Sequence, residues 1–173
     1  MMMRLVRQLR GDERGVSAVE FALIVPLLLA VLLGTVTIFD AFRTAQAAEK
    51  GTFTVGDMLS RQTAISQSML TSMLTFVEKT VNFDGAARMR VSSISNAAGT
   101  LVLDWSHSVG DQNLAIDAID YGTIPDIAVG DSVVLTEVFI PHQAFVAGFG
   151  FDRIVYNNKA VTRPRFVGKI AWQ

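Results

Sequence analysis

The sequence contains no cysteine and only two histidines. Without cysteine there is no disulfide, no thiolate metal site and no cysteine nucleophile. This absence does not identify the compartment, because an extracytoplasmic domain with a sufficient core needs no disulfide. The histidines, His107 and His142, are far apart and match no metal-ligand spacing, so we interpret both as surface residues near strand ends. The sequence therefore offers no metal site built on cysteine or histidine.

A basic excess is also missing. The 173 residues include 15 basic and 16 acidic side chains, with a formal net charge of −1, which does not indicate a nucleic-acid partner. There is no G-x-S-x-G nucleophile motif, no phosphate-binding glycine loop and no zinc-binding helix motif. We therefore expect a protein that is not an enzyme, with no catalytic residue, no cofactor and no small-molecule substrate.

Charge is scarcest over residues 16–39, where Glu20 is the single ionisable residue. A helix of this length reaches about 36 Å, enough to cross a hydrocarbon core of about 30 Å. Pro26 and Gly34 lie inside the run, as is common in membrane helices. Pro26 lacks a backbone N–H, so we expect a local kink there.

The charges on either side of this run predict its orientation. Four arginines precede it, and the other flank carries both signs, so the positive-inside rule places the N-terminus in the cytoplasm and the residues after 40 outside. The arginines are Arg4, Arg7, Arg10 and Arg14. Glu20 is unexpected in such a span, since a carboxylate that faces lipid costs about 2–4 kcal/mol and usually has a partner. Either it has such a partner, or it lies at the interface among lipid head groups.

We predict an α+β fold with a leader, a membrane helix and one extracytoplasmic domain. The divisions are a basic leader over residues 1–15, a transmembrane helix over 16–50 and an α+β domain over 51–173, with a hinge at Gly51 and Gly56. Apolar residues at helical spacing predict a second, amphipathic helix over 57–81 that packs on a sheet. Its apolar stripe comprises Met58, Leu59, Ile65, Met69, Leu70, Met73, Leu74 and Val77.

The last 90 or so residues favour a small antiparallel sheet. Strands are expected over 87–95, 100–108 and 131–142, the first two joined by a hairpin loop at the segment NAAG. A closing hairpin is expected from 150–158 and 160–173, with its turn at 157–159 and Pro164 at an edge or bulge. Residues 107–131 are expected to form a long loop with one helical turn around 114–119.

Two charged groups in this domain could bind ions. The loop carries Asp117, Asp120, Asp126 and Asp131, and carboxylate oxygens are ligands that calcium prefers. Their spacing matches no calcium-loop pattern, so we interpret them as a solvated loop. For Arg163 and Arg165, which flank Pro164, an anion site and a solvated strand face explain the sequence equally well.

The segment RGVSAVEFA, residues 14–22, resembles the cleavage site of type IV prepilins, especially the Flp and TadE-like branch of Tad (tight adherence) secretion systems. The resemblance implies that a membrane-embedded prepilin peptidase cuts after Gly15. Val16 would then be the new N-terminus and Glu20 the fifth residue. Phe21 stands where major Flp pilins usually have tyrosine. That departure, together with the large downstream domain, points to a TadE-like minor pilin or pseudopilin.

The resemblance also implies partners and a location. The partners would be the inner membrane, the prepilin peptidase, other pilins or pseudopilins and the Tad assembly-platform proteins. The chain would cross the bacterial inner membrane once, with its C-terminal domain in the periplasm, or reach the extracellular pilus. Glu20 of one subunit would neutralise the α-amino group of Val16 on an adjacent subunit, which is the kind of partner a buried carboxylate needs.

Three other interpretations stay open. Ala45 and Ala47 form an A-x-A pattern, so a conventional signal peptidase could cut near Ala47 and release a secreted domain. Against this, the apolar run exceeds the usual signal-peptide length of about 7–15 residues, and Arg43 is close to the cut. The chain could also be an uncleaved single-pass anchor whose outer domain binds a partner. A membrane-anchored enzyme is the third alternative, although no nucleophile–base arrangement is visible.

Overall fold

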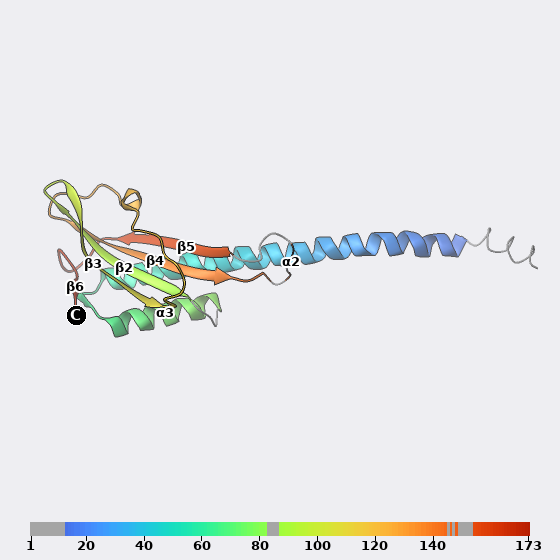
Figure 1. Ribbon diagram of the computed structural model, residues 1–173, viewed down its shortest axis with the longest axis horizontal. Helices are drawn as coiled ribbons and strands as arrows, with labels where there is room; N and C mark the ends of the chain where they lie inside the picture. The colour runs from blue at the N-terminus through green and yellow to red at the C-terminus, as the bar shows by residue number, and fades with distance from the viewer. Residues whose placement is uncertain (1–12, 83–86, 145, 147, 149–153) are drawn as a thin grey trace, which may run out of the picture.

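A computed structural model describes residues 13–82, 87–144, 146, 148 and 154–173 of the protein. The leader residues 1–12, with Arg4, Arg7 and Arg10, lie outside the described residues, as do the first four residues of the strand expected over 150–158. The described chain begins with one long helix, α2, which spans Glu13–Ser60. The N-terminal half of α2 projects away from the rest of the molecule, while its C-terminal half lies along a sheet (Figure 1).

The remaining elements form a folded head around the C-terminal half of α2. Helix α3 (Gln67–Val81) and a four-stranded antiparallel sheet of order β3-β2-β4-β5 make up most of it. The expected α+β class is confirmed, with one long apolar helix, a second helix and a small antiparallel sheet. The strands and the short 3-10 helix are β1 (Ala64–Ile65), β2 (Arg88–Ala97), β3 (Thr100–Gly110), η1 (Tyr121–Thr123), β4 (Ser132–His142), β5 (Ile154–Thr162) and β6 (Ala171–Trp172).

Alternate residues of the strands face two different layers. One face packs on α2 and α3, and its core includes Val55, Leu70 and Val138. The other face is covered by the loop between β3 and β4, where Ile124 and Ile127 pack on Leu135. The alternation of side chains along a strand produces this division.

The hinge expected at Gly51 and Gly56 is wrong, because α2 continues through both glycines. Their small size serves close packing instead. A Cβ on Gly51 would lie 3.3 Å from a methyl of Val77 in α3. A Cβ on Gly56 would lie 3.2 Å from the Cβ of Ala160 and 3.2 Å from the methyl of Thr162 in β5.

The second helix begins at Gln67 and not at Asp57, because residues 57–60 complete α2. Ser66 marks the start, since its hydroxyl accepts a hydrogen bond from the backbone N–H of Met69 at 3.4 Å. Asn82 closes the helix in the left-handed conformation. The predicted apolar stripe is largely buried, but Leu59 and Ile65 reach the core from α2 and β1.

The hairpin at NAAG is confirmed: Ala98 and Gly99 both have positive φ and join β2 to β3. The closing hairpin is wrong. Residues 157–159 continue β5, which pairs along its length with β4, and Lys159 lies opposite Glu137. Pro164 follows the end of β5, and β6 pairs in parallel with β1. Pairing with β4 outweighs the turn propensity of the Asn-Asn-Lys segment.

The helical turn expected around 114–119 is also wrong. The loop between β3 and β4 has its turn later, at η1. Asp120 stabilises η1, because its carboxylate accepts hydrogen bonds from the Gly122 N–H at 3.0 Å and the Thr123 hydroxyl at 2.9 Å. The hydrogen bonds from Thr123 and Gly122 hold the pKa of Asp120 below its usual value.

Candidate functional site

The N-terminal half of α2 is the largest exposed apolar surface of the described structure. The helix is long and apolar enough over Gly15–Ser60 to cross a membrane. Within its most apolar 18-residue stretch, only 11% is buried. Apolar side chains occupy all sides of the helix between residues 16 and 33, as in membrane spans. A soluble monomer rarely exposes a patch of more than a few hundred Å². This half of α2 therefore needs lipid or other helices around it.

The residues predicted for processing and assembly lie in the first turns of this half-helix. Gly15, Val16 and Glu20 are helical and exposed, and Phe21 is 69% exposed. A Cβ on Gly15 would have no atom within 4 Å among the described residues, so nothing described there blocks access to this position. Helix α2 is continuous across Pro26, and the kink expected there remains a prediction.

Glu20 forms no ion pair with any side chain that the structure describes. Toward the C-terminus, the next ionisable residue after Glu20 is Asp40, where the apolar run ends. The rise of an α-helix separates these two positions by about 30 Å, close to the thickness of a bilayer core. The two carboxylates therefore bracket the apolar segment, with Glu20 at one end and the folded head at the other.

Around Asp40, two strands of the head, β4 and β5, meet α2. Tyr156 of β5 donates a hydrogen bond to the carbonyl of Ala41 at 2.9 Å. His142, the last residue of β4, places Nε2 3.9 Å from a carboxylate oxygen of Asp40 and its ring 5.7 Å from that of Tyr156. Burial, with a smaller contribution from the charge of Asp40, raises the pKa of Tyr156. These contacts fix the head on α2 where the apolar segment ends.

A pocket of about 280 Å³ opens beside these contacts. It is lined by Asp40, Arg43, Thr44 and Ala47 of α2, Thr80, Val81 and Asn82 at the end of α3, and His142 and Gln143 at the end of β4. Sequence reasoning missed this site, because its residues come from three distant segments. The only local signal was that Asp40 and Arg43 directly follow the apolar run.

The structure corrects the interpretation of both histidines as surface residues near strand ends. His142 does end β4, but it is only 8% exposed. His107 lies within β3, and its ring stacks on that of Trp172 with centroids 3.5 Å apart. Trp105 joins them and donates a hydrogen bond to the carbonyl of Ile170 at 2.9 Å. His107 therefore helps to hold the C-terminal segment on the sheet.

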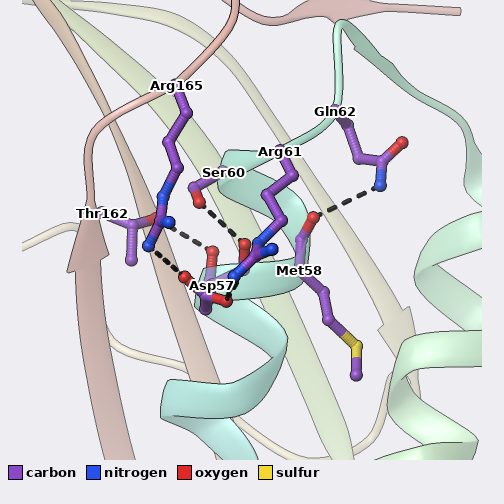
Figure 2. Close-up of polar contacts among 8 residues, drawn as sticks. Asp57, Met58, Ser60, Arg61, Gln62, Thr162 and Arg165 are labelled. Carbon is purple, nitrogen blue, oxygen red and sulfur yellow. Dashed lines mark hydrogen bonds and ion pairs between the residues drawn. The ribbon is translucent and has the colours of Figure 1, made fainter.

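Several charged residues of the head form ion pairs with one another. Arg163 lies 3.3 Å from Asp131, whereas Arg165 pairs with Asp57 near the end of α2, so these two arginines contact different acids. Asp57 also accepts a hydrogen bond from Arg61 at 2.8 Å (Figure 2). Within the described residues, no group of three or more histidine and acidic side chains is arranged to hold a metal ion. The acidic loop thus contributes to ion pairs and turns there.

A buried ion pair between β2 and β4 had no signal in the sequence. Arg90 donates from Nε to Glu137 at 2.6 Å, and from Nη1 to the carbonyl of Asp117 at 2.7 Å. Glu137 is 1% exposed and also faces Lys159 at 4.0 Å. Because Asp117 belongs to the loop that covers the sheet, this pair connects that loop to the strands. The sequence of a strand cannot show which of the strand's charged residues will be covered by a loop from elsewhere in the chain.

Comparison with known proteins gives a family match for part of the chain. Residues 15–65 match the family of TadE-like proteins, which confirms the resemblance drawn from the segment at residues 14–22. The match begins at Gly15 and covers the rest of α2 and β1. No curated protein and no solved structure matches the chain.

Proposed function

We propose, from the TadE-like match over residues 15–65, that this chain is a minor pilin or pseudopilin that takes part in the assembly of a Tad (Flp) pilus. The observation that carries the proposal is the exposed apolar half of α2, with a single carboxylate at Glu20. Such a helix is suited to lie first in the inner membrane and then among the helices of other subunits. We assign it no catalytic role.

In this proposal a prepilin peptidase cuts after Gly15 and frees the α-amino group of Val16. The new ammonium on Val16 and the carboxylate of Glu20 are four residues apart and belong to the same apolar helix end, where neither charge is well solvated. Pairing Glu20 of one subunit with the amine of its neighbour would compensate both charges. Before the cut the amine is absent, so processing would act as the signal for assembly.

The proposed topology follows from the same helix. Residues 1–15 are the cytoplasmic leader, residues 16–50 hold the membrane-spanning helix, and the domain of residues 51–173 lies in the periplasm or on the filament. The last ten residues of α2 belong structurally to the head, since Val55 and Leu59 lie in its core. Other pilins and the Tad assembly platform are the proposed partners.

The two alternative interpretations, a secreted domain and an uncleaved anchor, predict mature chains that begin at different residues. Cleavage near Ala47 would cut inside α2, next to the fully buried Ala48, and would expose a helix end beside the core. This geometry counts against a conventionally secreted domain. An uncleaved single-pass anchor would keep residues 1–15 and would leave the position of Glu20 without a function.

The mature N-terminus tests the proposal. We expect mass spectrometry of the protein purified from its native cells to give a chain that begins at Val16, and the full precursor when the prepilin peptidase gene is deleted. A chain that begins at Ala48 would establish a secreted domain. An intact N-terminus in both strains would establish a plain membrane anchor and would refute the proposal.

A further inference from the structure

The pocket beside Asp40 lies at one end of the apolar segment. Residues 21–39, between Glu20 and Asp40, contain no ionisable side chain and as a helix extend about 29 Å. If they fill the hydrocarbon core of a bilayer, Asp40 and the pocket are level with the lipid head groups. This inference rests on the membrane-spanning role proposed above for α2. In Figure 1 the pocket elements, the end of α3 and the end of β4, face the projecting half of α2.

His142 supplies evidence for a ligand in this pocket. Its side chain is 94% buried, yet Nε2 has no hydrogen-bond partner among the described residues. A carboxylate oxygen of Asp40 is 3.9 Å from this nitrogen, too far for a hydrogen bond. Buried polar atoms are nearly always hydrogen-bonded, so this nitrogen calls for a partner that enters the pocket. Arg43 also lines the pocket and has no ion pair with any described residue.

The pocket also has a side suited to a cation. Asp40 contributes a carboxylate that is 46% exposed. The last turn of α3, residues 80–82, adds the partial negative charge of a helix C-terminus. The lining contains one acid, Asp40, and one arginine, Arg43, so their formal charges cancel. This balance favours a zwitterionic ligand over a net anion.

We propose that the pocket binds the phosphoethanolamine head group of a phospholipid in the leaflet that faces the folded head. The phosphate would accept hydrogen bonds from Arg43 and His142, and the ammonium would donate to Asp40 and to the end of α3. The head group would thereby fix the depth and the tilt of the subunit in the membrane before it is extracted into a filament.

The experiment uses the full chain in nanodiscs made from equal parts of phosphatidylcholine, phosphatidylethanolamine and phosphatidylglycerol, with native mass spectrometry to count retained lipids. We expect preferential retention of phosphatidylethanolamine. Arg43→Gln should reduce that retention by about tenfold, the effect of losing one charge-assisted hydrogen bond. Asp40→Asn should abolish the preference for ethanolamine over glycerol head groups. Both side chains are at least partly exposed, so the core stays intact.

Matched controls lie on or just after the same helix. Glu49→Gln changes an exposed charge of α2, and Arg61→Gln changes an exposed charge directly after its last residue; both lie outside the pocket and should retain lipid as the wild type does. Equal retention by the Arg43 and Arg61 variants, or a preference for phosphatidylglycerol, would overturn the proposal. So would soluble glycerophosphoethanolamine that competes with the lipid at equal concentration, because the ligand would then be a free metabolite.

Failure of this inference can be distinguished from failure of the proposed function. Alkaline carbonate extraction of the same protein reports whether α2 is inserted in the membrane. An inserted chain without ethanolamine preference would overturn only the lipid assignment. A chain that carbonate extracts would overturn the membrane role as well.

Discussion

Glu20 is the residue on which the assembly proposal depends, because no described side chain pairs with it and its surroundings are apolar. We expect Glu20→Gln to leave membrane insertion unchanged but to lower the yield of assembled filaments by at least about tenfold. The reason is that the amine of Val16 would lose its partner in an apolar bundle, a cost of about 2 kcal/mol or more. Carbonate extraction and quantified pilus preparations measure the two effects. Glu49→Gln, which changes an exposed charge of α2 outside the apolar run, is the control, and normal filament yield in the Glu20 variant would contradict the pairing.

The Arg90–Glu137 pair makes a second residue-scale prediction, on stability. Arg90→Met leaves Glu137 buried with only Lys159 nearby, so we expect the free energy of unfolding to fall by about 3–5 kcal/mol. The exposed Arg61–Asp57 pair is the control, and Arg61→Met should cost less than about 1 kcal/mol. Urea unfolding of the detergent-solubilised chain, followed by near-UV circular dichroism, measures both. Similar losses in the two variants would show that burial of the first pair has no consequence.

At the scale of elements, the contact between α2 and β5 depends on the size of residue 56. A Cβ at Gly56 would approach Ala160 and Thr162 to 3.2 Å, and both lie on a paired strand that cannot easily move. We therefore expect Gly56→Ala to destabilise the head by about 1–3 kcal/mol through overpacking, although alanine favours a helix. Thermal unfolding measures the change. The nearest atoms to a Cβ on Gly51 all belong to one residue, Val77, with its methyls at 3.3 and 3.6 Å. The loss for Gly51→Ala should therefore be smaller, and the opposite order would refute this account.

For the whole molecule, Tyr156 makes one of the contacts that hold the head on α2. The pKa of Tyr156 is raised above its usual value of 10.0 by burial and by Asp40, so the folded state favours the neutral phenol. A raised pKa contributes stability that is complete below the unfolded pKa and is lost as the pH rises through the folded value. We expect the stability of the wild type to fall steeply above about pH 10, and Tyr156→Phe to lack this component.

Urea unfolding between about pH 8 and pH 11.5, a range that spans the usual tyrosine pKa of about 10, tests this expectation. Absorbance of tyrosinate at about 295 nm follows the ionisation directly. Tyr121, the other tyrosine, is exposed, so Tyr121→Phe serves as the control. Tyr156→Phe should also cost about 1 kcal/mol at neutral pH, through loss of the hydrogen bond to Ala41. Parallel pH profiles in the wild type and the Tyr156 variant would contradict the assignment.

The sequence by itself determined the features that depend on neighbours along the chain. The apolar run at residues 16–39, the motif around Gly15 and Glu20, the apolar stripe of α3 and the NAAG hairpin are all set by composition and short-range periodicity. Such patterns are visible because a helix or a hairpin repeats over a few residues.

Only the tertiary structure decided the features in which distant segments compete with local preference. Gly51 and Gly56 suggested a hinge, yet close contacts to α3 and β5 keep them inside a continuous helix. Residues 157–159 suggested a turn, yet pairing with β4 extends them as a strand. The pocket at Asp40 and the buried pair at Glu137 join residues about 100 and 47 positions apart. Packing and strand pairing decide these cases, because their free energies exceed the small local propensities that a single sequence reveals.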